Sequence, residues 1–281
     1  MMFLLALTSS ALYGAADFLG GVASKRLSTT VVVAISQATG LAVLLVAVSL
    51  LPRADPAGAD FAYGAAAGLA GTIGVGLLYR ALAIGVMAVV APTTAVCAVA
   101  IPVLAAIAFG ERPGLATIGG IALAIAAIVL VSQSSVPVRD APARHTSASA
   151  FSLAVIAGIA IGFFFLALAR TSDEAGLWPL VAARGVSVGL FAAIARLTSK
   201  PLRIPMGILG TVAAGGILDM LANLLYLIAT RSGPLSVVVT LASLYPASTV
   251  FLARIVLHER LNTRQWIGVV CAMVAVAMIV R

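Results

Sequence analysis

Long apolar stretches follow one another along almost the whole chain, and only short polar segments separate them. Each stretch holds about 20 or more residues, the length that an α-helix needs to cross the hydrocarbon core of a bilayer. The pattern predicts ten membrane spans, at residues 2–22, 29–51, 61–82, 85–109, 113–133, 151–170, 176–197, 206–231, 233–257 and 261–280. We therefore expect an all-α, multi-pass integral membrane protein in which almost no residues remain for a soluble domain.

The composition agrees with a membrane protein. Apolar residues make up 62% of the chain and charged residues only 9%, whereas a soluble domain carries about 25% charged residues. We assign the net charge of +8 to loop cations that fix membrane orientation, so no nucleic-acid partner is expected. Cys97 and Cys271 lie inside predicted spans, and His145 and His258 are isolated. The sequence therefore predicts no disulfide, metal site or cofactor.

One long polar segment, residues 134–150, interrupts the apolar pattern and is rich in Ser, Pro and Ala. As a linker it separates residues 1–133 from residues 151–281, with five predicted spans on each side. A shift of 148 positions aligns Glu111–Arg112 with Glu259–Arg260 at the ends of matching spans. The chain therefore contains an internal repeat of two five-span units.

The odd number of spans in each repeat determines how the two units are related. A chain that has crossed the membrane five times enters its second copy from the opposite side. The sequence thus predicts two inverted five-helix repeats around a central polar cavity. This architecture is typical of secondary transporters, whose substrate site lies at the repeat interface near the midplane.

Two segments, residues 77–131 and 224–280, resemble the paired EamA modules of the drug/metabolite transporter superfamily. Each resembling unit has five spans, and an acidic residue, Glu111 or Glu259, closes its fourth span. The resemblance covers essentially the whole chain. It implies a ten-span transporter in the membrane, and the chain is most similar to the YddG-like exporters of amino acids and related metabolites.

Ionisable residues inside spans are costly, and they are functional candidates by default. Away from span ends, the chain has three of them, Asp17, Arg184 and Asp219. One arginine can neutralise one aspartate and hold two helices together, and the second aspartate then remains free to carry a proton or meet a substrate amine. The sequence leaves open whether Arg184 pairs with Asp17 or with Asp219.

Span eight carries Asp219, Asn223 and Tyr226, whose spacing places them within an arc of roughly 60°. Such a stripe either lines a cavity or forms hydrogen bonds between helices. Tyr13 shares the helical face of Asp17, four residues earlier. The predicted substrate-binding residues are Tyr13, Asp17, Tyr79, Arg184, Asp219, Asn223, Tyr226, Ser243 and Tyr245.

Prolines inside spans four and nine, Pro92, Pro102 and Pro246, are predicted to interrupt these helices and to act as hinges. Each proline frees the carbonyl four residues earlier, which is tolerated where the backbone lines protein or a wet cavity. Neighbouring hydroxyls, such as those of Thr93 and Thr94, are candidates to satisfy the freed carbonyls. Close helix packing is predicted at three GxxxG spacings, formed by Gly64 and Gly68, Gly158 and Gly162, and Gly185 and Gly189.

The motifs that would indicate another activity do not occur in the sequence. It contains no phosphate-binding G-x-x-x-x-G-K-[ST] loop and no H-E-x-x-H zinc motif. We predict a secondary transporter, not an enzyme, that exports a small-molecule substrate such as an amino acid or a related metabolite. It would act as a single chain in the lipid bilayer of a bacterial inner membrane. The alternative is an integral-membrane enzyme that acts on a lipid with Asp17 or Asp219 as base.

Loop cations predict the orientation in the membrane. Eleven Lys and Arg residues lie on the side of the linker and five on the side of the termini, and Arg184 completes the 17. The positive-inside rule therefore places the linker in the cytoplasm and both termini outside. The family resemblance implies cytoplasmic termini instead, and we follow the charges.

Overall fold

The computed structural model describes residues 1–50, 54–85, 87–132, 148–197, 204–257 and 263–280. Within these ranges every regular element is a helix. The all-α prediction is confirmed for this part of the chain. Long apolar helices are expected because a membrane span must satisfy its backbone hydrogen bonds within the segment itself.

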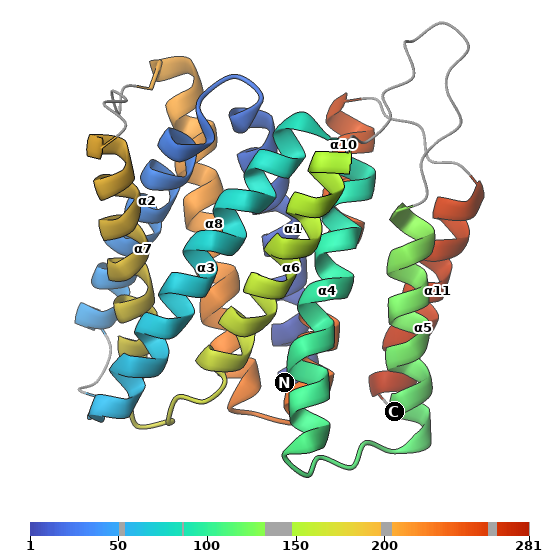
Figure 1. The fold of residues 1–281 in the computed structure, drawn as a ribbon. Helices are drawn as coiled ribbons and strands as arrows, with labels where there is room; N and C mark the ends of the chain where they lie inside the picture. Colours follow the sequence, from blue (N-terminus) through green and yellow to red (C-terminus); the bar gives the residue numbers. More distant parts are fainter. Residues whose placement is uncertain (51–53, 86, 133–147, 198–203, 258–262, 281) are drawn as a thin grey trace, which may run out of the picture.

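The helices follow the predicted spans closely (Figure 1). The first half of the chain contains α1 (Met2–Ser24), α2 (Thr29–Leu50), α3 (Gly58–Ile84), α4 (Met87–Ala108) and α5 (Leu115–Ser132). The second half contains α6 (Ala148–Leu168), α7 (Trp178–Leu197), α8 (Met206–Thr230), α9 (Leu235–Ala242), α10 (Tyr245–Leu257) and α11 (Thr263–Val280). Helix α1 begins and α11 ends at the same face of the molecule, at the bottom of Figure 1, which we call the terminal face.

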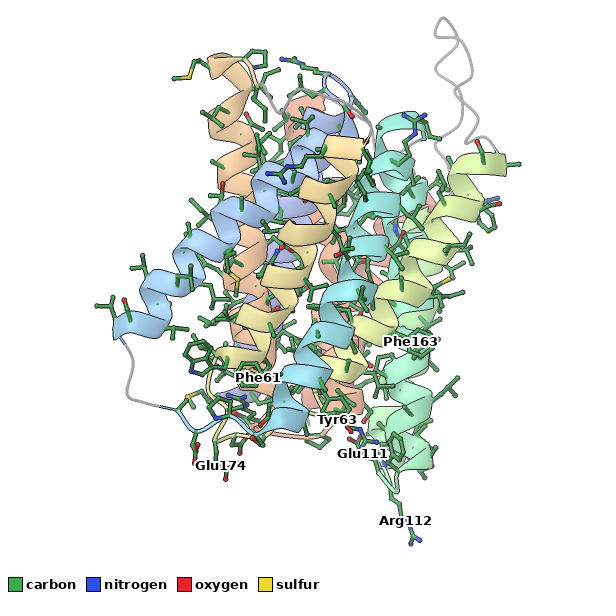
Figure 2. The ribbon with its side chains drawn as sticks, turned by 60° about the vertical axis from the view of Figure 1, so that its left-hand side comes forward. Phe61, Tyr63, Glu111, Arg112, Phe163 and Glu174 are labelled. Atoms are coloured by element: carbon green, nitrogen blue, oxygen red, sulfur yellow. The ribbon has the colours of Figure 1, made fainter. Side chains whose placement is uncertain are left out.

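Eight helical stretches in the described ranges are long and apolar enough to cross a membrane. One of them, Leu235–Val256, combines α9 with α10, and α5 contributes a shorter apolar helix at Ile118–Ala127. Near the terminal face, Phe61 and Tyr63 are exposed (Figure 2), as aromatic residues at a membrane interface often are. The chain is therefore a multi-pass integral membrane protein, and the count of ten spans stays a prediction.

Helices from opposite halves pack against each other extensively. In the predicted repeat, α1, α2, α3 and α4 correspond to α6, α7, α8 and the pair α9 and α10. The contact of α3 with α6 then corresponds to that of α8 with α1, and the contact of α4 with α6 corresponds to those of α9 and α10 with α1. The contact of α3 with α7 likewise corresponds to that of α2 with α8, while α5 and α11 pack together at one edge (Figure 1). Exchanging the helices of one half for those of the other therefore maps the main contacts onto one another.

Two of the three predicted GxxxG pairs lie at close helix contacts. A Cβ atom at Gly68 would lie 2.5 Å from the Ala183 carbonyl oxygen of α7, and one at Gly158 would lie 2.4 Å from the Thr94 carbonyl oxygen of α4. Gly64 and Gly162 show the same close approach to α7 and α4. The third prediction is wrong, because no atom of another helix lies within 4 Å of the Cβ positions of Gly185 and Gly189 of α7 in the described structure. The packed face of α7 carries Ala183 instead.

The predicted proline interruptions require two corrections. Helix α4 runs without a break through Pro92 and Pro102. The break in span nine lies between Ala242 and Tyr245, so Pro246 stands in the first turn of α10, where a missing N–H costs little.

The hydroxyls beside the α4 prolines bind carbonyls other than the freed ones. Pro92 frees the carbonyl of Ala88, but the Thr93 hydroxyl donates to the Val89 carbonyl at 2.7 Å. The Thr94 hydroxyl donates to the Ala154 carbonyl of α6 at 3.1 Å. These hydroxyls therefore support local helix geometry and the contact between α4 and α6.

Some boundaries predicted from the sequence fall outside the described ranges. Most of the predicted linker 134–150 lies there, but its last three residues already belong to α6, which begins at Ala148. His258, Glu259 and Arg260 also lie outside the described residues.

Candidate functional site

A cavity lies among the central parts of α1, α2, α3, α6, α7 and α8, beside the start of α10. Including its open mouth it measures about 610 Å³. Its polar lining consists of Tyr13, Asp17, Gln37, Arg184, Ser187, Asp219, Asn223 and Tyr245. The structure therefore brings together six of the nine predicted substrate-binding residues: Tyr13, Asp17, Arg184, Asp219, Asn223 and Tyr245.

Arg184 of α7 and Asp219 of α8 form an ion pair in the cavity wall. Arg184 Nη2 donates to Asp219 Oδ2 at 2.5 Å, and the two side chains are only 7% and 14% exposed. The sequence left open which aspartate pairs with the arginine, and the geometry selects Asp219. Removing either partner would leave an uncompensated buried charge, which is strongly destabilising.

Asp17 is the second carboxyl group of the cavity. It comes from α1, its side chain is buried, and it forms no ion pair or hydrogen bond within the described residues. An unpaired carboxylate is costly in an apolar environment, so such a group favours a positively charged or hydrogen-bond-donating partner. Asp17 is thus able to hold a proton or to receive a positively charged group.

Asn223 connects α8 with α1 across the cavity. The Tyr13 hydroxyl donates to Asn223 Oδ1 at 3.0 Å, and Asn223 Nδ2 donates to the Asp219 carbonyl oxygen of its own helix at 2.6 Å. The Tyr13 ring also meets Phe165 and Tyr245 edge-on, with centroid distances of 5.8 and 6.4 Å. Asn223 and this aromatic cluster fix the wall around the two acidic residues.

Three predicted residues lie outside the cavity lining. The Tyr226 hydroxyl donates to the Phe165 carbonyl oxygen at 3.1 Å, so this end of the predicted stripe supports α6. The Tyr79 ring fills the space above Gly20, where a Cβ atom would lie 2.0 Å from the ring. Ser243 is fully buried at the break between α9 and α10. Of the predicted stripe, Asp219 and Asn223 thus line the cavity, whereas Tyr226 lies outside its lining.

Two polar residues of the cavity lining were not predicted, Gln37 of α2 and Ser187 of α7. Each is 4% exposed. Gln37 Oε1, Ser187 Oγ and the Tyr245 hydroxyl are buried without a hydrogen-bond partner in the described structure. Ser187 lies three residues after Arg184, on the same helical face, and this spacing was the signal that could have identified it. Gln37 was detectable as a carboxamide inside an apolar span.

Two carboxylates outside the cavity join the halves of the chain near the terminal face, and Figure 2 labels one of them, Glu111. Glu111, just after α4, accepts hydrogen bonds from the backbone N–H groups of Leu235 at 2.7 Å and Ser236 at 3.2 Å, and from the Ser236 hydroxyl. It thereby caps the N-terminus of α9, where the helix dipole favours negative charge.

Asp60, in the first turn of α3, makes the second connection. Its carboxylate accepts hydrogen bonds from the Ser172 N–H at 2.7 Å and the Ser172 hydroxyl at 3.0 Å. Arg231, just after α8, holds the same loop by donating to the carbonyl oxygens of Ser172 at 2.7 Å and Gly176 at 2.9 Å. We call the Glu111–Ser236 and Asp60–Ser172 contacts the terminal clamps.

Comparison with known proteins gives a match over most of the chain. Residues 1–133 and residues 148–281 each match the profile of the EamA-like transporter family. No curated protein matches the chain. One crystal structure of a protein with 18% sequence identity superposes with a TM-score of 0.72, covering 99% of this chain and 95% of that chain. This likeness shows that the two chains share a fold.

Proposed function

The chain belongs to the EamA-like transporter family, and from this premise we propose that it is a secondary transporter that exports amino acids or related small metabolites by alternating access. The observation that carries the proposal is the central cavity, in which a buried ion pair, an unpaired carboxyl group and unpartnered hydrogen-bonding groups meet. These polar groups stand against a largely apolar wall, a combination that is typical of sites for small molecules.

The proposed architecture has ten spans in two inverted five-helix repeats, residues 1–133 and 151–281. Helices α5 and α11 would supply the fifth and tenth spans, and α9 with α10 would form the ninth. The exchange symmetry of the helix contacts supports this arrangement. The family profile also matches the two halves separately, as two copies of one unit would.

Alternating access requires the cavity to open toward one face at a time. In this structure the terminal clamps tie the halves together at the terminal face. Helix α9, which Glu111 caps, ends at the break beside Tyr245 of the cavity. Opening at the terminal face would therefore require release of the clamps and movement of α9, with the break and Pro246 as the hinge.

Asp17 supplies a coupling mechanism for export across a bacterial inner membrane. Because it has no cationic partner in the described structure, it can exchange a proton for a substrate cation during the cycle. The alternative function, an enzyme that uses Asp17 or Asp219 as base on a lipid, has no observation in its favour. Asp219 is held by Arg184 and is not free to act as a base.

Reconstitution of the full chain into liposomes tests the proposal. We expect labelled amino acids to cross the bilayer, and Asn223→Ala to lower the flux at least about tenfold, since it removes a polar group of the cavity wall. Tyr226→Phe, on the same helix but outside the cavity, should retain most of the flux. The proposal fails if no small metabolite crosses the bilayer, and a chemically altered lipid would favour the enzyme alternative.

A further inference from the structure

We propose that the α7 side of the cavity is a carboxylate subsite, in which Arg184, Ser187 and Gln37 bind the carboxylate of the solute. This inference rests on the proposed transport function for its biological role. It goes beyond that function by naming the part of the solute that is recognised and the residues that recognise it.

The guanidinium of Arg184 retains donors for a ligand. An arginine side chain has five N–H donors. In the described structure Arg184 donates to Asp219 through Nη2, and the side chain forms part of the cavity wall. The ion pair therefore fixes the position of the guanidinium and leaves further N–H groups for an incoming anion.

Ser187 and Gln37 extend this donor group from two helices. Ser187 lies one helical turn after Arg184, and its buried Oγ has no partner among the described residues. On α2, the Cβ position of Gly40 lies 3.7 Å from Arg184 Cζ, and Gln37 is one turn earlier on this face. The Gln37 carboxamide lines the same cavity.

The unpartnered atoms point to a ligand. Buried polar groups in native proteins nearly always have a hydrogen-bond partner, because an unsatisfied one destabilises the fold. Ser187 can donate its hydroxyl hydrogen, and Gln37 can present its NH₂ group after a rotation of the amide, which interchanges nitrogen and oxygen. An ion pair that served only to join α7 and α8 would not require these two groups beside it.

The charges of the cavity favour a single carboxylate over a dianion such as phosphate. Asp219 already pairs with the Arg184 guanidinium, and Asp17 lines the same cavity, so a dianion would add two negative charges where the cation is already partly neutralised. The planar guanidinium matches the planar carboxylate in a two-point contact. The apolar wall, which includes Val75, Leu78 and Phe164, suits an apolar body attached to that carboxylate.

Binding to the full chain in nanodiscs tests the subsite with three matched probes. Leucine carries both charged groups, 4-methylpentanoate lacks the amine, and 3-methylbutylamine lacks the carboxylate. We expect calorimetry to show binding of leucine and 4-methylpentanoate, with 3-methylbutylamine at least about tenfold weaker, because a site built for a charged hydrogen-bonding group rejects analogues without it. Equal or tighter binding of the amine, or binding of none of the three, overturns the subsite.

Variants test which residues bind the carboxylate. Ser187→Ala and Gln37→Ala should each weaken leucine and 4-methylpentanoate about tenfold and leave the amine unchanged, since each removes a hydrogen bond to a charged group. Arg184→Lys keeps a cation for Asp219 but loses the planar fork, and we expect a loss of about a hundredfold for both carboxylates. Gly189→Ala, on the open face of α7, is the control and should bind like the parent.

Transport measurements separate the two proposals. Carboxylate-dependent binding without any flux in liposomes would leave the subsite standing and refute the transport function. Flux that is the same for leucine and 3-methylbutylamine, and unaffected by Ser187→Ala, Gln37→Ala and Arg184→Lys, would refute the subsite and leave the transport function standing.

Discussion

At the scale of single residues, the ion pair between Arg184 and Asp219 determines how the cavity wall is built. Both side chains are buried between α7 and α8. In such a setting the attraction between the two charges mainly offsets their loss of hydration. The intact pair therefore contributes little net stability. Loss of either residue, however, leaves the other as an uncompensated buried charge.

A double-mutant cycle tests this dependence. Arg184→Met and Asp219→Asn should each lower the free energy of unfolding by about 3 kcal/mol, because each leaves a buried group without its partner. The combined variant should lose clearly less than the sum of the two. Chemical denaturation in detergent micelles measures all four proteins, and strictly additive losses would show that the charges do not interact.

Residue chemistry also explains which parts of the site the sequence could predict. Asp17, Arg184 and Asp219 were identifiable because a charge inside an apolar span needs a reason. Gln37 and Ser187 were missed because neutral polar groups are less costly in a span and give a weaker signal. The choice of Asp219 over Asp17 as the partner of Arg184 depends on how α7 and α8 pack, which the sequence does not specify.

At the scale of helices, close packing depends on glycines that face a neighbouring backbone. The Cβ position of Gly158 lies 2.4 Å from the Thr94 carbonyl oxygen and 2.5 Å from Cys97 Cβ, so a methyl group there would push α6 away from α4. The same GxxxG spacing at Gly185 and Gly189 faces open space. Spacing alone thus indicates a possible contact, and the rotation of the helix decides whether it is used.

Substituting alanine at these glycines should therefore give opposite results. Gly158→Ala should destabilise the protein by about 1–3 kcal/mol through overpacking. Gly189→Ala should be neutral or slightly stabilising, because alanine is the better helix former. Thermal unfolding in detergent compares the two variants, and similar unfolding temperatures would contradict the packing of α6 against α4.

The helix boundaries were predictable for a simple reason, whereas the effect of the prolines was only partly predictable, since span nine is broken near Pro246 as expected and span four is not broken. Spans appear in the sequence because the bilayer sets their length. The effect of a proline depends on its neighbours: α4 continues through Pro92 and Pro102, while the chain breaks ahead of Pro246. The contact between Glu111 and the N-terminus of α9 was also not predictable, because the two are more than 120 residues apart in the sequence.

The terminal clamp at Glu111 provides a prediction for helix α9. In a variant with Cys97 and Cys271 replaced by alanine, Thr240→Cys places a thiol on α9, where Thr240 is buried. Adding Glu111→Ala removes the cap and should make this thiol react several-fold faster with a small, charged reagent applied at the terminal face.

The control for this experiment lies at the same face. Glu174 is exposed there (Figure 2), and its carboxylate makes no clamp contact in the described structure. Glu174→Ala should leave the reaction rate of the Thr240→Cys thiol unchanged. Equal rates in the parent and in the Glu111→Ala variant would refute the role of Glu111 in holding α9.

At the scale of the whole molecule, the two halves share one central cavity. The contacts that exchange between the halves, such as α3 with α6 and α1 with α8, surround this cavity. The ion pair, the unpaired Asp17 and the unpartnered Ser187 all lie within it. Relative movement of the halves would thus change access to the same set of side chains.

The most direct test of transport through this cavity blocks it from inside. Ser187→Cys, in a chain with Cys97 and Cys271 replaced by alanine, places one thiol in the cavity wall. We predict that alkylation of this thiol with a bulky maleimide abolishes amino-acid flux in liposomes, and that the transported amino acid slows the alkylation. Undiminished flux after complete alkylation would contradict the claim that solutes cross through the central cavity.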